Sequence, residues 1–322
     1  MITKRFHANA LWVNSKYKSE LLALSGTIRE PITNVRPPRT LYHYTTSGGL
    51  IGIVSSQRLW ATNALYLNDA SEISYGYSII RNYARTTHER TEDSGYGAFL
   101  QQAEGMMDDP NGPSRDCYVT CFCESGDLLS QWRVYGSRGG GYAIGFSTPE
   151  IGMNFGAPPN FFLRKVIYES AKQEEVVGKV LRSTYEAYKG LTEGKTKDEA
   201  ESIRVILWHF LQDHLHDLML GFKHPGFAEE HEWRLVEPFH AIERDAHIDR
   251  VKFRADASGI VPYVELDISP AAGVNTAKLP MNRVCLGPAL HSALSKRAVT
   301  MMLSKNQYHF VEVEQSQVPL RP

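Results

Sequence analysis

The sequence predicts an α+β fold in which a mixed, mostly antiparallel sheet forms the core and helical insertions interrupt it. Short runs typical of strands recur at uneven spacing, at 41–45, 58–62, 117–123, 142–146, 161–169, 229–236, 251–254, 260–268, 283–286 and 308–314. Segments with helical periodicity are grouped between them, at about 67–88, 98–107, 171–190, 197–221 and 289–303. Strands of mixed spacing with grouped helices are typical of α+β domains.

The chain has 322 residues, of which 42% are hydrophobic, and this is enough for a sizeable core. We expect residues 1–38 to form an N-terminal helical appendage and linker, because a helical pattern at 17–28 is followed by three prolines. Residues 39–322 then form a single α+β domain. Its helical insertions are expected at about 63–115 and 170–222.

Charge and hydropathy limit the classes of partner. With a net charge of -1 and a sequence pI of about 6.9, the chain has no domain-wide basic surface for duplex nucleic acid. No apolar run approaches the ~20 residues of a membrane-spanning helix, and polar residues follow Lys4 and Arg5 too closely for a signal peptide. Four cysteines are too few for a disulfide scaffold. We therefore expect a cytoplasmic protein with no membrane partner.

The stretch 229–236 is the most informative candidate site. Read as a strand with a period of two, it places Glu230, Glu232 and Arg234 on one face. The opposite face carries His231, Trp233 and Leu235. Close carboxylates repel, which raises the proton affinity of one of them, and a neighbouring arginine opposes this effect. Because such a row is costly inside a core, we expect it on a surface or in a wet cleft, where a solvated ion pair is the simpler interpretation.

Two further candidates have an ordinary structural interpretation. His43 lies near the end of the strand at 41–45, a position that often presents a side chain into a cleft. The simpler interpretation is a core histidine bonded to backbone. Asp69 and Glu72 match a capping box at the start of the helix at 67–88, which explains both residues without a role in a site.

The segment 127–136 predicts a helix of one or two turns that carries Gln131, Trp132, Arg133 and Tyr135. Its hydrogen-bonding groups and two aromatic faces suit a planar ring and a phosphate. The simpler interpretation is a packed tryptophan beside a solvated arginine.

Three cysteines lie in the predicted strand at 117–123. Their C-x-x-x-C-x-C spacing lacks the paired CxxC of zinc sites, and no histidine is close in the sequence. We interpret them as small buried hydrophobic residues, and we predict no metal site.

The chain resembles a large bacterial family that is catalogued only as a domain of unknown function. The resemblance rests on an ordered set of motifs: LYHYT, LND-x-SE, CFCE, LSQWRVYG, GYAIGF, EHEWRLV, VPYVEL, CLGP and VPLR. These motifs run from Leu41 to Arg321, and their order is more specific than any one of them. The resemblance by itself implies no function.

A second resemblance is to the ADP-ribosyltransferase superfamily, which uses a strand-end histidine, an aromatic residue on the next core segment and a glutamate on a later strand. His43 in YHYT is similar to the first, and Tyr135 in SQWRVYG to the second, with Tyr142 as its rival. Glu232 is similar to the third, and Glu230 stands where arginine-directed members carry Glu or Gln. The spacer before Glu230 is longer than in the superfamily, and the usual serine-containing strand motif is not evident.

This resemblance implies an ADP-ribosyltransferase-like fold and an enzyme, either a transferase or an NAD glycohydrolase, with NAD as substrate. Cleavage of the nicotinamide–ribose bond passes through an oxocarbenium-like cation, which Glu232 would stabilise while Glu230 activates an acceptor. His43 would bind the adenosine-side ribose and Tyr135 would stack on nicotinamide. The other implied NAD contacts are Tyr44, Thr45, Gln131, Trp132, Arg133, Tyr142, Arg234 and Arg254, with Arg133 or Arg254 at the pyrophosphate.

Two other classes of function stay open. A non-catalytic sensor would bind a nucleotide at the same site without turnover. A metal-dependent phosphodiesterase or nuclease would use Asp69, Glu72, Glu230 and Glu232. For a transferase the acceptor would be a protein or a nucleic acid, and a role in toxin or phage-defence systems is only an association with the superfamily.

Overall fold

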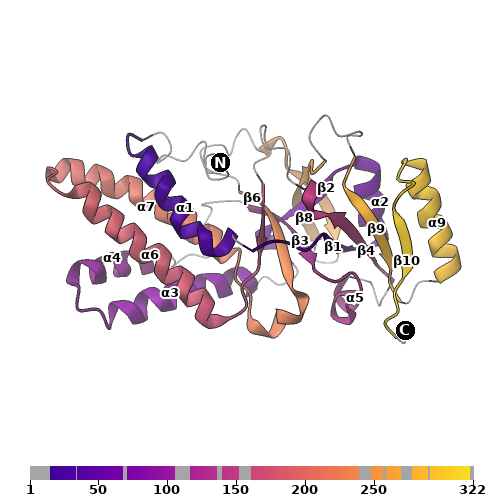
Figure 1. The fold of residues 1–322 in the computed structure, drawn as a ribbon, viewed down its shortest axis with the longest axis horizontal. Coiled ribbons are helices and arrows are strands. Elements are labelled where there is room, and N and C mark those ends of the chain that lie inside the picture. Colours follow the sequence, from indigo (N-terminus) through magenta and orange to yellow (C-terminus); the bar gives the residue numbers. More distant parts are fainter. Residues whose placement is uncertain are drawn as a thin grey trace.

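The computed structural model describes most of the chain and shows an elongated molecule, with long helices at one end and most of the sheet at the other (Figure 1). The described residues are 15–33, 35–67, 71–105, 117–135, 140–151, 161–238, 248–256, 259–269, 278–288 and 291–319. The mixed α/β character and the mostly antiparallel sheet agree with the predicted α+β class.

The sheet has the strand order β10-β9-β4-β1-β3-β2-β8-β7, with β6 paired to β3 and β5 paired to β6. Its strands are β1 (Thr40–Thr45), β2 (Leu59–Asn63), β3 (Cys117–Cys123), β4 (Tyr142–Ser147), β5 (Phe162–Lys165), β6 (Glu232–Pro238), β7 (Lys252–Asp256), β8 (Gly259–Leu266), β9 (Met281–Leu286) and β10 (Glu312–Gln315). The pair β9–β10 is parallel, and the other named pairs are antiparallel.

The sheet forks at β3. Strand β6 pairs with β3 along its whole length, from Cys117 to Cys123. A strand has only two hydrogen-bonding edges, so β1 and β2 must share the other one. Strand β1 meets β3 at Cys123, whereas β2 meets it at Val119 and Tyr118. Between these two contacts, neither β1 nor β2 pairs with this edge of β3, and side chains lie beside it instead.

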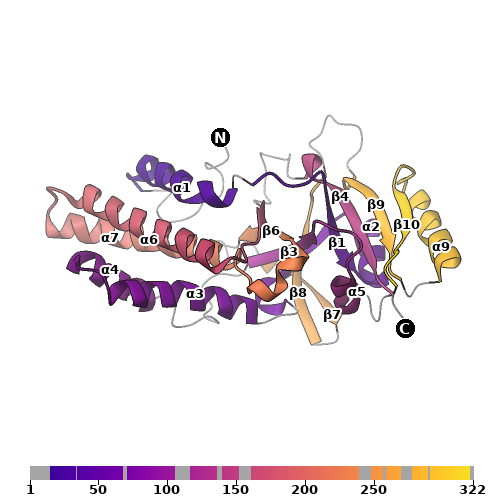
Figure 2. The same ribbon diagram turned by 60° about the horizontal axis from the view of Figure 1, so that its bottom comes forward.

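The helices are α1 (Lys18–Thr33), α2 (Ser47–Ser56), α3 (Ser71–His88), α4 (Ser94–Gly105), α5 (Leu129–Tyr135), α6 (Ser170–Thr192), α7 (Lys197–Met219) and α9 (Ser292–Lys305). Helices α6 and α7 lie between α1 on one side and α3 with α4 on the other (Figure 2). None of the helices in the described ranges has both the length and the apolar character needed to cross a membrane.

The two larger hydrophobic clusters of the described residues form separate cores. Apolar stripes of the long helices form the first, and α1 contributes Leu21 and Ile28 to it. Ser25 also hydrogen-bonds His214 on α7, with Oγ 2.9 Å from Nε2, so α1 is packed into the helical core. The second core lies between the sheet and helices α2 and α9, where Val54 and Leu303 are buried.

Strand β6 starts later than the sequence pattern predicts. The residues before it, Pro225–Glu230, form a 3-10 helix (η4), and His231 has a positive φ of 42°. His231 is therefore exposed and does not share a buried face with Trp233 and Leu235, which corrects that part of the expected alternation. The predicted strand at 161–169 is likewise shorter, since β5 ends at Lys165.

Candidate functional site

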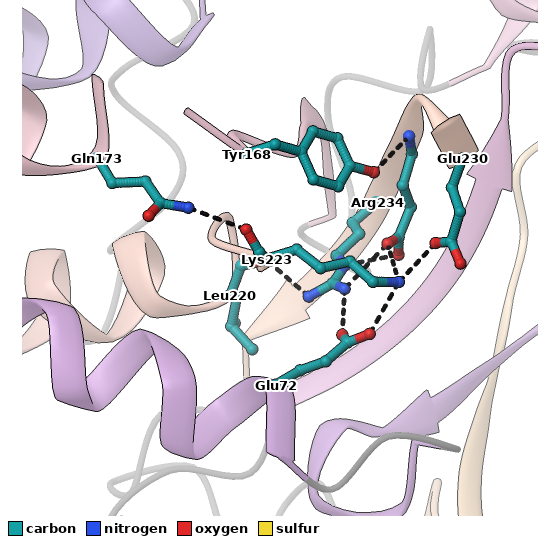
Figure 3. A network of polar contacts seen from close by, with 8 residues as sticks. Glu72, Tyr168, Gln173, Leu220, Lys223, Glu230 and Arg234 are labelled. Carbon is teal, nitrogen blue, oxygen red and sulfur yellow. Dashed lines mark hydrogen bonds and ion pairs between the residues drawn. The ribbon is translucent and has the colours of Figure 1, made fainter. Parts of the chain in front are cut away.

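A buried ammonium group lies at the centre of the candidate site. Lys223, in the connection between α7 and η4, places its Nζ 2.8 Å from Glu72 Oε1 and 2.6 Å from Glu230 Oε2. The same Nζ lies 2.9 Å from Glu232 Oε2. Figure 3 shows Glu72 and Glu230 reaching Lys223 from different sides. These carboxylates come from the start of α3, the end of η4 and the start of β6.

Arg234 forms the second cationic group. Its Nε donates to Glu232 Oε1 at 2.7 Å, and its Nη2 pairs with Glu72. Its Nη1 donates to the carbonyl of Leu220 at 3.1 Å. Arg234 is 2% exposed and Glu232 is 3% exposed, so this pair is inside the protein. The expectation that the row lies on a surface or in a wet cleft is therefore wrong for both residues.

The charged row tolerates burial because further charged groups pair with it. Lys223, which the sequence pattern did not single out, completes a cluster of three carboxylates and two cations. Glu72 belongs to this cluster too, and the sequence pattern grouped it with Glu230 and Glu232 only in the metal-dependent alternative. Paired and hydrogen-bonded charges are the form in which charges are found inside proteins. Counting Glu72, Glu230 and Glu232 as −3 and the two cations as +2 leaves a formal charge of −1 when all are ionised.

Glu232 is held as a carboxylate. Burial opposes its ionisation, but the charges of Arg234 and Lys223 outweigh burial and lower its pKa to about 2. Burial would lower the pKa of Lys223, yet Glu232 and Glu72 raise it above its ordinary value. Both oxygens of Glu232 accept hydrogen bonds from these two cations, and the expected contact of Glu232 with a ribose stays a prediction.

Glu230 differs from its neighbours. Burial raises its pKa, and Lys223 only partly opposes this effect. Its side chain keeps 15% of its exposure, and only Oε2 has a partner among the described residues. Glu230 is therefore the carboxylate of the cluster with an oxygen available to a ligand.

Backbone contacts fix the cluster in place. The amide of Glu232 donates to the hydroxyl of Tyr168 at 3.0 Å. The side-chain amide of Gln173 donates to the carbonyl of Lys223 at 3.0 Å, and Tyr75 in turn donates to Gln173 Oε1 at 3.0 Å (Figure 3 shows Gln173 and Tyr168). The segments that carry Lys223 and Glu232 are thus tied to α3 and α6.

His43 lies at the fork of the sheet. Its Nδ1 is 3.0 Å from the carbonyl oxygen of Cys121, in the stretch of β3 that neither β1 nor β2 covers. Burial lowers the pKa of His43, the bond to Cys121 opposes the shift, and the charge of Arg254 adds to it. A neutral ring facing a carbonyl carries its proton on Nδ1, which leaves Nε2 as an acceptor.

Cys121 connects this histidine to the charged cluster. It faces Arg234 across the β3–β6 ladder, and its thiol hydrogen-bonds Glu232. Burial and the charge of Glu232 raise the pKa of the Cys121 thiol well above its ordinary value, so it stays protonated. Cys117 and Cys123 are buried and Cys121 is partly buried, as expected for small hydrophobic residues in a core strand.

Tyr135, the last residue of α5, is partly buried against a small hydrophobic cluster that includes Cys123 and Trp132. Burial raises the pKa of its phenol, and Cys121 and Glu232 raise it further. The convergence of His43, Tyr135 and Glu232 on one nucleotide site stays a prediction.

Three other residues predicted to contact NAD have well-defined structural partners. Trp132 is 0% exposed and donates Nε1–H to Asp127 at 2.7 Å. Tyr44 donates its hydroxyl to the carbonyl of Ser125 at 3.1 Å and packs edge-to-face on Trp132. Tyr142 is buried in the core between the sheet and α2. Trp132 and Tyr44 thus hold α5 against the sheet, and the predicted contacts of all three side chains with NAD stay predictions.

The remaining candidates lie in different surroundings. Gln131 is buried, whereas Arg133 is exposed on α5, and Thr45 is half-buried at the end of β1. Arg254 donates to Thr62 Oγ1 at 2.8 Å on the β7–β2 side of the fork. Asp69, with Asn68, lies outside the described residues.

Within the described ranges, no group of three or more His, Cys, Asp or Glu side chains is arranged to hold a metal ion. The three clustered carboxylates have the Lys223 ammonium between them. Lysine and arginine donors therefore occupy the carboxylate oxygens that a cation would need.

Comparison with known proteins identifies residues 131–235 with a family described as a protein of unknown function, DUF2971. The match covers about a third of the chain and includes Tyr135, Lys223, Glu232 and Arg234. It confirms the resemblance to a domain family of unknown function over that segment. No curated protein and no solved structure matches the chain.

Proposed function

Because the DUF2971 family carries no assigned function, we propose one from the site: an NAD-consuming, ADP-ribosyltransferase-like enzyme in which Glu230 is the carboxylate that faces the reacting ribose. The observation that carries the proposal is the contrast within the cluster. Glu232 is buried and saturated by cations, whereas Glu230 has a free oxygen and a raised pKa. A carboxylate with these properties is suited to general-base chemistry.

The charge of the cluster suits a cationic transition state. When the bond between C1′ and the nicotinamide nitrogen breaks, nicotinamide leaves with the bonding electrons and the ribose becomes oxocarbenium-like. The formal −1 charge around Glu230 stabilises this cation in a water-poor site. An acceptor X–H then forms the bond from X to C1′ and transfers its proton to Glu230, so NAD and the acceptor give nicotinamide and an ADP-ribosylated product.

The neighbouring groups supply contacts for the rest of the nucleotide. His43 has Nε2 available to accept a hydrogen bond from a ribose hydroxyl. In this proposal the ring of Tyr135 stacks on nicotinamide. Arg254 has a charge that acts on His43, and no such effect involves Arg133 among the described residues. We assign Arg254 to the pyrophosphate on this basis.

The acceptor is a macromolecule in this proposal, and the structure favours neither protein nor nucleic acid. The metal-dependent phosphodiesterase is less favoured, because Lys223 and Arg234 neutralise the carboxylates that would bind the metal. The non-catalytic nucleotide sensor uses the same groups and differs only in turnover.

Incubation of the protein with NAD, followed by mass spectrometry of nicotinamide and of labelled acceptors, tests the proposal. We expect Glu230→Gln to reduce nicotinamide release by roughly 100- to 10,000-fold, the usual contribution of a general base. Glu229→Gln is the matched control, because Glu229 is the adjacent, exposed carboxylate of η4. Saturable binding of NAD without turnover by the wild-type protein would instead establish the sensor.

A further inference from the structure

Lys223 is held by contacts at both its ammonium group and its backbone carbonyl. Its ammonium has three hydrogens, and each faces a carboxylate, at 2.8 Å for Glu72, 2.6 Å for Glu230 and 2.9 Å for Glu232. Its backbone carbonyl accepts a hydrogen bond from Gln173, so the residue is fixed at both ends. Glu72 and Glu232 have Arg234 as a second partner, but Glu230 has Lys223 alone among the described residues.

We propose that Lys223 is the positioning residue of Glu230: it holds the Glu230 side chain in place and keeps it in the carboxylate form, and Glu72 competes with Glu230 for the same ammonium. A substitution at Lys223 or at Glu72 therefore changes the charge that acts on Glu230. Neither Lys223 nor Glu72 has to touch a substrate for this role.

The surroundings of Glu230 support this assignment. Its neighbouring charged and titratable groups are Glu72, Cys123, Tyr135, Tyr168, Lys223 and Glu232. Burial raises the pKa values of the thiol and both phenols, so these three groups are neutral. Glu72 and Glu232 raise the pKa of Glu230, as burial does. Lys223 is the group in this set that lowers it.

The catalytic meaning of this arrangement rests on the proposed function. A general base must be deprotonated before it accepts a proton, and a desolvated glutamate among other carboxylates resists that. Lys223 removes this obstacle without closing the site, because it occupies Oε2 and leaves Oε1 to a ligand. The charge relationship between Lys223 and Glu230, in contrast, does not depend on any reaction.

Carboxyl ¹³C NMR of glutamate-labelled protein measures the titration of Glu230 directly, and the signal that disappears in Glu230→Gln identifies it. In Lys223→Met we expect the Glu230 midpoint to rise by about one pH unit or more, the usual effect of losing an adjacent opposite charge. In Glu72→Gln we expect it to fall, because a competing carboxylate is removed. Lys223→Arg should stay near the wild-type midpoint, because it retains the charge.

Shifts of opposite sign in Lys223→Met and Glu72→Gln support the proposal, since loosened packing alone would not move the midpoint in both directions. An unchanged midpoint in Lys223→Met, or an upward shift in Glu72→Gln, overturns it. If Lys223→Met does not fold, the direction of the shift in Glu72→Gln decides. These titrations need no turnover, so they can support the role of Lys223 even if nicotinamide release shows that the proposed function is wrong.

A kinetic measurement separates the same outcomes in the active enzyme. If the wild-type protein releases nicotinamide, the acidic limb of its pH–rate profile should move with the NMR midpoint in each variant. Lys223→Arg should restore the profile that Lys223→Met shifts. A profile that stays fixed while kcat falls would assign Lys223 to folding alone and overturn the positioning role.

Discussion

Nδ1 of His43 lies 3.0 Å from the carbonyl oxygen of Cys121, and this contact joins β1 to β3 where the sheet forks. The same cysteine uses its thiol to hydrogen-bond Glu232. One residue of β3 therefore fixes the histidine through its backbone and contacts the charged cluster through its side chain. The relative positions of His43 and Glu232 follow from this shared contact.

The half-buried imidazole of His43 predicts a pH-dependent stability. Burial lowers the folded-state pKa of His43 below its ordinary value near 6.5. Its contribution is therefore complete above pH 6.5 and is lost as the pH falls below that value, because the unfolded chain binds the proton more tightly. Urea denaturation gives the difference in the free energy of unfolding between the wild type and His43→Asn. We expect this difference to be larger at about one pH unit above 6.5 than at about one unit below it.

His309→Asn is the matched control, because His309 is exposed and its replacement should leave the pH dependence of the wild type unchanged. If the wild type and His43→Asn differ by the same free energy of unfolding at both pH values, the imidazole is not buried in its neutral form.

The guanidinium of Arg234 predicts a large effect on stability. Arg234→Met leaves Glu72 and Glu232 with Lys223 as their only common cation, and breaking a buried pair in this way typically costs about 3–5 kcal/mol. The exposed pair of Arg204 and Glu201 on α7 is the control, and Arg204→Met should cost at most about 1 kcal/mol. Urea denaturation near neutral pH compares the two, and equal losses would contradict the burial of the cluster.

The sequence identified one part of this site because strand geometry is local. Glu232 and Arg234 lie on the same face of β6, as a period of two requires. Glu72 pairs with Arg234 across 162 positions of sequence, and such pairing is decided by how α3 packs beside the end of α7. A capping motif gave Glu72 a sufficient local explanation, and the single lysine at 223 has no pattern that distinguishes it.

In the fold, too, local sequence patterns predicted some features, whereas long-range packing determined others. Short, largely apolar runs located β3 and β4, and the long amphipathic stripes located α6 and α7. The fork of the sheet was not predicted, because it depends on where β1 and β2 end along one edge of β3, and no local pattern encodes that position. The exposed position expected for the charged row was wrong for the same reason, since its counter-charge lies on another element.

The lowered pKa of Glu232 predicts sensitivity to acid. The ordinary glutamate value is 4.5, and the pKa of Glu232 is lowered to about 2 by Arg234 and Lys223. Its ionisation therefore stabilises the fold above pH 4.5, and this stabilisation is lost as the pH falls towards 2. The free energy of unfolding of Glu232→Gln should be lower than wild type near neutral pH but fall less steeply across this window.

Glu229→Gln should follow the wild-type curve, because Glu229 is exposed. Parallel curves for the wild type and Glu232→Gln would show that Glu232 is not held by the two cations.

The last prediction concerns Asp127, which ties α5 to the C-terminal segment. Its Oδ1 accepts from Trp132 Nε1 at 2.7 Å and from Ser316 Oγ at 2.5 Å, and its Oδ2 accepts from the amide of Gln317 at 2.9 Å. Asp127→Asn keeps an acceptor for Trp132 but turns an NH₂ group towards the Gln317 amide. Since a hydrogen bond to a charged group contributes about 1.5–3 kcal/mol, we expect a loss of that order in stability.

Hydrogen exchange distinguishes this local effect from general destabilisation. In Asp127→Asn the amide of Gln317 should exchange faster than in the wild type, whereas the indole of Trp132 should stay protected because it remains buried. Asp249→Asn, an exposed aspartate outside this contact, should change neither. Because α5 carries Tyr135, a larger KM for NAD in Asp127→Asn would connect the C-terminal segment to the candidate site, and unchanged protection of Gln317 would show that Asp127 does not hold that segment.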